Sequence, residues 1–147
     1  MTVLAINGIG RIGKNVLKFI LEANMNVKLI NDSLGNTDIH RHLLEFDSVH
    51  GRWKANFTNN KESISINNKR LTFTNFKKIE DLHLDNIDIV LDCTGAYKSY
   101  KKLEPYFDKG VKKVIVSAPV TDSRIANLVY GINPVSYTHL TLPTRWD

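Results

Sequence analysis

The chain has 147 residues, of which 42% are hydrophobic and 24% charged, and its formal net charge is +5 at pH 7. These fractions are typical of one globular domain, and no apolar run approaches the roughly 18 residues that a membrane-spanning helix needs. Its single cysteine excludes an internal disulfide framework and a cysteine-rich metal site, so we expect a cytoplasmic protein without a metal. Lysines and arginines occur in scattered pairs, and we therefore expect no nucleic-acid partner and no membrane partner.

A G-x-G-x-x-G loop lies close to the N-terminus, at Gly8, Gly10 and Gly13. An apolar run at residues 3–6 precedes it, and apolar residues at helical spacing follow it from residue 12 to residue 21. In a dinucleotide-binding domain the first glycine allows a tight turn, the second lets the backbone approach a pyrophosphate, and the third lets the helix pack on the sheet. The pyrophosphate would bind at the helix N-terminus. A glycine-rich turn without a ligand is the alternative that this motif alone leaves open.

Asp32 follows a second apolar run, at residues 27–30. An acid about 20 residues beyond the glycines can hold both hydroxyls of an adenine ribose. Its alternative role is a carboxylate that caps a strand end or a helix. Strand, loop, helix, strand and acid in this order favour a dinucleotide site.

The middle of the chain, residues 33–76, is expected to hold a helix, a turn and a small insertion, and we assign no chemistry to the insertion at residues 54–76. Apolar spacing predicts a short amphipathic helix at residues 37–45, followed by a turn at residues 47–53. We interpret His50 in that turn as a loop histidine that holds backbone groups, because no nucleophile stands near it for it to activate. Period-two alternation at residues 63–66 and 71–74, with turn residues at 59–61 and 67–69, predicts a small antiparallel insertion at one edge of the main sheet.

The second half returns to the pattern of a parallel sheet. Expected strands at residues 87–92 and 111–116 end in Cys93-Thr94-Gly95 and in Ser117. Ligands of open α/β sheets bind outside the carboxyl ends of the strands, so Thr94, Gly95 and Ser117 are expected to face the cofactor. Between these strands we expect a helix at residues 98–109, kinked or split at a proline, and after them a last strand at residues 128–133. The expected inward side chains of the helix are Tyr100, Leu103 and Phe107.

Cys93 has two interpretations. A reactive thiol needs exposure and an activating partner, and the sequence shows neither. A buried small side chain at a strand end is the usual situation of a free cysteine, and we favour it.

The whole pattern predicts an α/β fold of the Rossmann type, a doubly wound and mostly parallel sheet with a small antiparallel insertion. Within it, the chain carries INGIGRIG at 6–13, IND at 30–32, FDSVHGRW at 46–53, DCTG at 92–95, KKVIVSAP at 112–119 and VYGIN at 129–133. In these motifs and their order it resembles the cofactor domain of glyceraldehyde-3-phosphate dehydrogenase. The DSVHG stretch is far more specific than the glycine loop, because most Rossmann dehydrogenases lack it.

The resemblance implies NAD as the cofactor and assigns family roles to matching positions. Arg11 and Ile12 would lie at the pyrophosphate, Asp32 at the adenosine ribose and Ser117 near the nicotinamide, with Thr94 and Gly95 as further backbone contacts. Lys77 stands where the family usually has an arginine beside the adenine. Ser33 stands where NAD-specific members often have leucine, which could tolerate the 2′-phosphate of NADP, but Asp32 would repel that phosphate.

From Pro134 onward the chain departs from the family pattern. We therefore interpret residues 1–133 as the dinucleotide-binding domain and residues 134–147 as a disordered or artefactual tail, out-of-frame or foreign coding being favoured over genuine divergence. The family's nucleophilic cysteine motif and its second, catalytic domain are absent, so no catalytic residue is assigned, His139 included.

The resemblance implies that the full-length protein is a homotetrameric enzyme of glycolysis that oxidises a small phosphorylated aldehyde by covalent catalysis and passes a hydride to NAD. The fragment itself is expected to be inactive. An erythrose-4-phosphate dehydrogenase and a non-catalytic dinucleotide-binding module remain alternatives.

Overall fold

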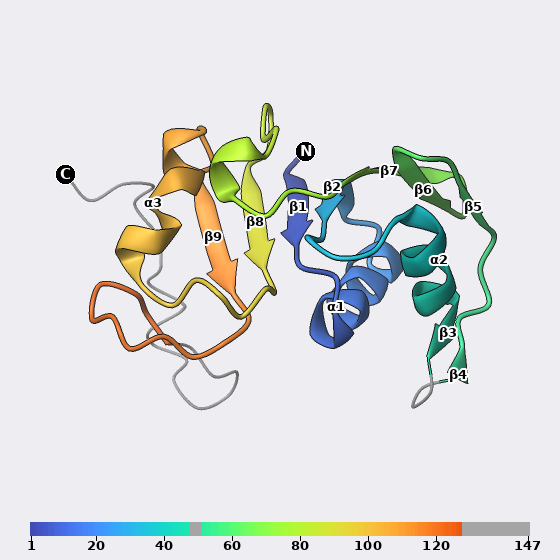
Figure 1. Ribbon diagram of the computed structural model, residues 1–147, viewed down its shortest axis with the longest axis horizontal. Coiled ribbons are helices and arrows are strands. Elements are labelled where there is room, and N and C mark those ends of the chain that lie inside the picture. Colours follow the sequence, from blue (N-terminus) through green and yellow to red (C-terminus); the bar gives the residue numbers. More distant parts are fainter. Residues whose placement is uncertain (48–50, 128–147) are drawn as a thin grey trace.

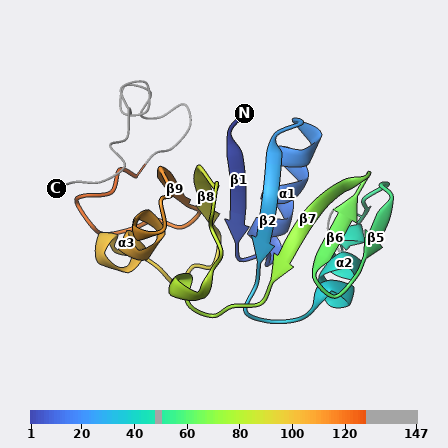
Figure 2. The same cartoon turned by 90° about the horizontal axis from the view of Figure 1, so that it is seen from above.

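The computed structural model describes residues 1–47 and 51–127. In this part of the chain a seven-stranded sheet with the order β5-β6-β7-β2-β1-β8-β9 forms a central layer between helices on both faces (Figures 1 and 2). The parallel strands are β1 (Val3–Asn7), β2 (Asn26–Asn31), β7 (Lys69–Thr74), β8 (Ile89–Asp92) and β9 (Lys113–Val116), and the antiparallel ones are β5 (Phe57–Asn59) and β6 (Ser63–Ile66). The expected doubly wound, mostly parallel sheet is confirmed.

The helices are α1 (Arg11–Glu22), α2 (Thr37–Glu45), α3 (Tyr100–Asp108) and the short 3-10 helix η1 (Ile79–Asp81). Successive side chains of a strand point to opposite faces of the sheet, and the helices with which they pack therefore lie on opposite faces. Leu4 and Ile6 of β1 share a core cluster with buried residues of α1 and α2, whereas Ala5, between them, shares the other cluster with residues of α3 and η1. Figure 2 shows the same division, with α3 on the opposite side of the sheet from α1 and α2.

The carboxyl ends of the parallel strands lie level with one another along one side of the sheet, here called its carboxyl edge. Asn7, the last residue of β1, pairs with the last residue of each neighbouring strand, Asn31 of β2 and Asp92 of β8. Further out, Asn31 pairs with Thr74 and Asp92 pairs with Val116. The loops that follow these strands therefore start side by side, and this carboxyl edge is where open α/β sheets bind their ligands.

The antiparallel insertion lies at one edge of the sheet, as expected, but its last strand also belongs to the main sheet. β6 and β7 form a hairpin through Asn67 and Asn68, whose positive φ angles of 50° and 66° suit a tight turn. β7 then pairs with β2 in parallel. Period-two alternation indicates a strand but does not identify its neighbours, so this pairing was not predictable.

Other boundaries differ only slightly from expectation. Pro105 lies inside α3 without splitting it, and the inward side chain expected at Phe107 is instead Tyr106, which is fully buried. Where a turn was expected at residues 47–53, β3 (Phe46–Asp47) and β4 (Gly51–Arg52) form a two-stranded ladder. His50, the strand at residues 128–133 and the tail at residues 134–147 lie outside the described residues.

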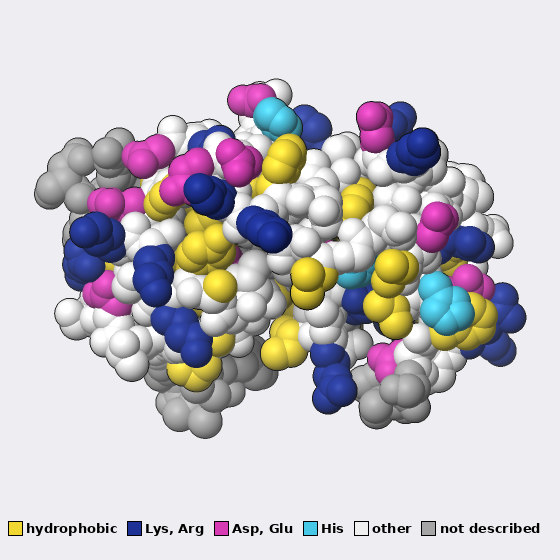
Figure 3. Space-filling view, viewed as in Figure 1, with side chains coloured by type: hydrophobic (Ala, Val, Ile, Leu, Met, Phe, Trp, Pro, Cys, Tyr) yellow, Lys and Arg dark blue, Asp and Glu magenta, His cyan; other side chains and the backbone are white. Residues whose placement is uncertain are grey.

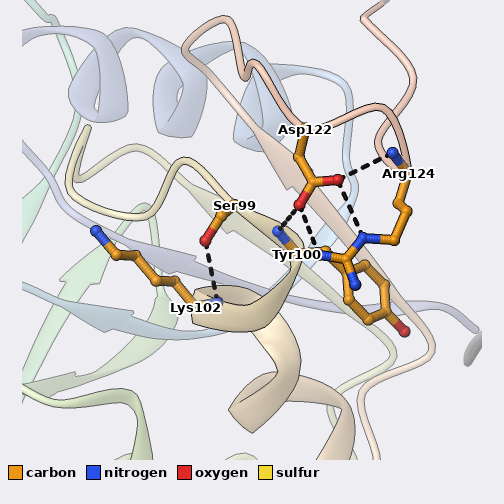
Figure 4. A network of polar contacts seen from close by, with 5 residues as sticks. All are labelled: Ser99, Tyr100, Lys102, Asp122 and Arg124. Carbon is orange, nitrogen blue, oxygen red and sulfur yellow. Dashed lines mark hydrogen bonds and ion pairs between the residues drawn. The ribbon is translucent and has the colours of Figure 1, made fainter.

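The segment after β9 is fastened to the N-terminus of α3 (Figure 4). The carboxylate of Asp122 accepts hydrogen bonds from the backbone N–H of Tyr100 at 2.8 Å and from the backbone and guanidinium of Arg124 at 2.9–3.1 Å. The Ser99 hydroxyl caps the same helix by accepting from the N–H of Lys102. Both side chains supply acceptors for the free N–H groups of the first helical turn.

The surface carries no large basic block on the face drawn in Figure 3, where lysine and arginine side chains are interspersed with aspartate and glutamate. Among the described residues, no helix combines the length and the apolar character that crossing a membrane requires.

Candidate functional site

The three glycines of the loop between β1 and α1 differ in their surroundings. Gly8 has a φ of +91°, and a Cβ there would lie 2.7 Å from the backbone nitrogen of Thr94. A Cβ on Gly13 would overlap the carbonyl oxygen of Gly8. A Cβ on Gly10, in contrast, would meet no atom of the described residues within 4 Å. The fold itself therefore requires glycine at positions 8 and 13, whereas nothing in the part of the chain that the structure describes requires it at position 10.

The loop leads into a helix N-terminus that no side chain caps among residues 1–47 and 51–127. Gly10 is the N-cap residue of α1, and the first turn of this helix holds no acidic residue. The side chains of Asn36 and Ser99 cap α2 and α3 by accepting backbone N–H groups. The first turn of α1 thus presents free N–H groups and the positive end of the helix dipole beside an exposed arginine, Arg11, which is an arrangement that suits an anion.

Asp32, the residue after β2, connects two loops at this edge. Its carboxylate accepts the backbone N–H of Ile9 at 2.9 Å and the N–H of Leu34 at 2.9 Å. The side-chain amide of Asn75 fixes the same segment from the β7 side, donating to the carbonyls of Asp32 and Gly35. Each carboxylate oxygen of Asp32 accepts one backbone hydrogen bond, which leaves lone pairs for ribose hydroxyls. The structural and the ligand-binding role expected for Asp32 are therefore compatible.

A chain of buried hydrogen bonds runs beneath the loops, across the ends of the strands. The Thr74 hydroxyl donates to the side-chain oxygen of Asn31, the Asn31 amide to that of Asn7, and the Asn7 amide to the hydroxyl of Tyr106 at 2.7 Å. Tyr106 in turn donates to Asp92 at 2.5 Å. The side chains of Asn7, Asn31, Tyr106 and Asp92 are buried, so these bonds satisfy polar groups that water does not reach.

Asp92 carries this chain into the turn after β8. Its second carboxylate oxygen accepts both the backbone N–H and the hydroxyl of Thr94, at 3.1 and 2.7 Å. The next residue, Gly95, has a φ of +70°. Burial raises the pKa of Asp92, and the hydrogen bonds from Tyr106 and Thr94 oppose that rise. Thr94 also lies against Gly8, so the turn after β8 and the glycine loop are in direct contact at the carboxyl end of the sheet.

Comparison with known proteins agrees with this geometry. The family model described as the NAD-binding domain of glyceraldehyde 3-phosphate dehydrogenase matches residues 2–100. The chain belongs to this family. The matched residues include the glycine loop, Asp32, Lys77, Thr94 and Gly95.

Curated relatives carry the same family name. A glyceraldehyde-3-phosphate dehydrogenase of Cereibacter sphaeroides is 38% identical over 138 residues, which are 92% of this chain and 41% of the relative. The protein of that name from Xanthobacter flavus is 38% identical over 141 residues, 92% of this chain and 42% of the relative. Glyceraldehyde-3-phosphate dehydrogenase 1 of Giardia intestinalis is 33% identical over 142 residues, 95% of this chain and 42% of the relative. The chain thus spans about two fifths of the length of these relatives.

The residues that follow β8 and β9 are Cys93, which we expected to be structural, and Ser117, an expected site residue. Cys93 is half-buried, where we expected a buried side chain, and packs against the core cluster on the α1 face. Burial and the nearby charge of Asp92 raise the pKa of its thiol, while a hydrogen bond with the Ser117 side chain lowers it. Ser117 is exposed and lies one residue beyond the end of β9. This environment disfavours the thiolate, as expected for a structural cysteine.

Lys77 belongs to the segment after β7 and lies beside Tyr97, which follows the Thr94 turn in the chain. The side chain of Lys77 is exposed, and its backbone carbonyl accepts the hydroxyl of Tyr97 at 3.2 Å. The remaining expected residues at this edge belong to the glycine loop, the Asp32 loop and the Thr94 turn, which backbone and side-chain contacts join.

Sequence reasoning did not find several polar residues that shape this edge. Asn7 and Asn31 each end a buried strand, and a polar residue at the end of an apolar run is the signal that could have indicated them. Lys14 and His40 occupy α1 and α2, where no sequence pattern distinguishes them from surface residues.

Proposed function

We propose that the carboxyl edge of the parallel strands binds NAD and that the chain serves as the cofactor domain of a phosphorylating glyceraldehyde-3-phosphate dehydrogenase. The observation that carries this proposal is the open space in front of Gly10, next to the uncapped N-terminus of α1. In a loop whose other two glycines are fully packed, this space is where a pyrophosphate would approach the free N–H groups. Gly10, Arg11 and Ile12 would hold it.

Asp32 would hold the ribose of the adenosine half. Its two backbone hydrogen bonds fix the carboxylate at the start of the loop after β2. Two ribose hydroxyls could donate to it, whereas the 2′-phosphate of NADP would meet a negative charge. We therefore assign NAD in preference to NADP, in spite of the small side chain of Ser33, and place Lys77 at the adenine.

The nicotinamide half would extend toward Thr94, Gly95 and Ser117. The bound cofactor supplies a hydride acceptor, and the chain's own residues bind and orient it. Asp92 supports that orientation by holding Thr94 through its backbone N–H and its hydroxyl. In the full-length protein the substrate would be a small phosphorylated aldehyde, and the assembly a homotetramer. The 147-residue chain by itself would bind NAD without turning over substrate.

The sharpest test of this assignment is Gly10→Ser. Gly10 has φ −72° and ψ −154°, an extended conformation that serine adopts freely at an N-cap. A serine hydroxyl there would accept one of the free N–H groups and would fill the space in front of them. We expect the free energy of unfolding to rise by a few tenths of a kcal/mol or stay unchanged. NAD affinity, measured by calorimetric titration, should fall about tenfold or more.

Gly10→Ala is the matched control, because alanine fills part of the same space without capping the helix. We expect it to lose NAD affinity as well, together with a small loss of stability. If Gly10→Ser and Gly10→Ala both bind NAD as tightly as the wild type, the loop is only a turn and the assignment is wrong.

A further inference from the structure

His40, in the middle of α2, is 5% exposed and uses both of its ring nitrogens. Its Nε2 lies 2.6 Å from the carbonyl oxygen of Leu34, and its Nδ1 lies 3.4 Å from Nζ of Lys14. Because a carbonyl can only accept, Nε2 carries the proton and Nδ1 accepts from the lysine. The His40 ring in this tautomer therefore connects α1 to the loop after β2.

Lys14 lies one turn into α1, beneath the glycine loop. Its ammonium group donates to the carbonyl of Ile9 as well as to His40. Burial lowers the pKa of Lys14, and the nearby charge of Asp32 raises it. The lysine is thus turned inward onto the loop, although it belongs to the first turns of a surface helix.

We call the side chains of Lys14, His40 and Asp32 the Asp32 cluster. Together they form hydrogen bonds with the backbone N–H and the backbone carbonyl of both Ile9 and Leu34. Asp32 accepts the N–H of Ile9 and the N–H of Leu34. Lys14 donates to the carbonyl of Ile9, and His40 donates to the carbonyl of Leu34. One backbone residue belongs to the pyrophosphate loop and the other to the loop after the ribose-binding acid, so the cluster holds these two loops in one arrangement.

The loop after β2 is shaped to admit the histidine. Gly35 has a φ of +79°, and a Cβ on it would lie 2.8 Å from Nε2 of His40. The ring also lies against Phe73 of β7, with centroids 5.5 Å apart. The position of His40 is therefore fixed by packing on two sides, and its hydrogen bond to Leu34 is made at a fixed place.

We propose that Lys14 and His40 are positioning residues for the adenosine half of the cofactor. They hold the Ile9 and Leu34 peptides, and those peptides orient the Asp32 carboxylate toward the ribose. The proposal rests on the proposed function and deepens it, because it makes the preference for NAD over NADP depend on residues that touch neither cofactor. A purely structural role for His40 would change stability and would leave that preference unaltered.

The test compares His40→Leu with His40→Gln in the full 147-residue chain. Leucine removes both hydrogen bonds and keeps the apolar volume, whereas the glutamine amide can again donate and accept. We expect His40→Leu to lower the affinity for NAD about tenfold and the affinity for NADP by less, which narrows the preference for NAD. We expect His40→Gln to restore much of the NAD affinity and much of the preference. The measurements are calorimetric titrations with NAD and with NADP, beside the thermal midpoint of each protein without ligand.

His42→Leu is the matched control, because His42 lies on the same helix, is exposed and contacts Phe46 at 5.0 Å between ring centroids. It should leave the affinities for both cofactors unchanged. The proposal is overturned if His40→Leu binds both cofactors like the wild type, or if it weakens both by one common factor. A wild-type chain that binds neither cofactor refutes the proposed function, which is a separate result and removes the basis of this inference.

A second pair of variants covers the case in which His40→Leu does not fold. Lys14→Met keeps the apolar stem of the half-buried lysine and removes its donors, and Lys18→Met makes the same change one turn further along α1, where the ammonium lies 5.7 Å from the ring centre of Trp53. We expect Lys14→Met to weaken NAD binding about tenfold and Lys18→Met to leave it unchanged. Equal affinities for these two variants would overturn the proposal.

Discussion

The hydroxyl of Tyr106 donates to the carboxylate of Asp92 across 2.5 Å, although both side chains are fully buried. The pair joins α3 to the end of β8, and the same carboxylate holds the Thr94 turn. Burial raises the pKa of each group, because both would have to carry a charge away from water. Asp92 is a buried acid that positions the Thr94 turn, where we propose that the cofactor binds, so its replacement should affect both stability and binding.

The first prediction concerns Asp92→Asn, which removes the titration and keeps the size of the side chain. Asp92 has a pKa above its ordinary value of 3.8, so between that value and the raised pKa the folded chain holds a proton that the unfolded chain has lost. The wild type should therefore gain stability relative to Asp92→Asn as the pH falls from 7 to 4. We expect about 1.4 kcal/mol for each unit by which the pKa is raised, measured by urea denaturation at a series of pH values.

Asp88→Asn is the control of opposite sign. The N–H of Val3 and the ammonium of Lys112 lower the pKa of Asp88. The stabilisation of the fold by ionised Asp88 is fully present above pH 3.8 and is lost as the pH falls through the lowered pKa. The wild type should therefore lose stability relative to Asp88→Asn in that pH range. If both differences moved in the same direction, the account of Asp92 would be wrong.

The second prediction is that Gly13→Ala destabilises the fold, unlike Gly10→Ala. A Cβ on Gly13 would overlap the carbonyl of Gly8, and neither backbone segment can move freely because Gly8 is itself packed against Thr94. Overpacking of this kind costs about 1–3 kcal/mol. Thermal unfolding without cofactor should therefore show a large fall in midpoint for Gly13→Ala and a small one for Gly10→Ala. Equal midpoints would mean that α1 can shift away from the loop at little cost.

Local patterns predicted much of this fold because they reflect local physics. The helix at residues 37–45 was expected at its observed bounds, since its apolar spacing agrees with the Asn36 cap at its start. The glycine spacing likewise predicted which glycines the fold needs, Gly8 for the turn and Gly13 for helix packing. In each case the sequence signal itself is local, although the contact that requires Gly8 is with Thr94, far along the chain.

Features that depend on register were not predictable. The chain of hydrogen bonds that begins at Thr74 and ends at Asp92 forms because four strands end level with one another. The sequence of a single strand does not contain that information. The inward residue of α3 is Tyr106 instead of Phe107, because the buried stripe follows the spacing Tyr100, Leu103, Tyr106 from the Ser99 cap. The Asp32 cluster brings together residues 14, 32 and 40, and only the packing of α2 beside α1 makes it visible.

The third prediction is that Asp32 selects NAD over NADP. Asp32→Asn removes the charge that would repel a 2′-phosphate and keeps one acceptor for the backbone, whereas Asp32→Ala also releases the N–H groups of Ile9 and Leu34. We expect both variants to narrow the NAD preference about tenfold or more, and Asp32→Ala to lower NAD affinity further. The measurement is the dissociation constant for each cofactor. A wild type that binds NADP as tightly as NAD would contradict the assignment.

The last prediction is that the purified 147-residue chain forms no NADH from glyceraldehyde 3-phosphate and phosphate. Its single thiol, Cys93, is half-buried, and burial and Asp92 raise its pKa, so at neutral pH it holds less thiolate than an ordinary cysteine. Thiolate activation and substrate positioning each contribute orders of magnitude to covalent catalysis, so turnover should not exceed background. Cys93→Ser is the control and should behave like the wild type, with NAD affinity retained in both. Substantial activity that disappears in Cys93→Ser would show that Cys93 is a nucleophile and would refute its structural role at the end of β8.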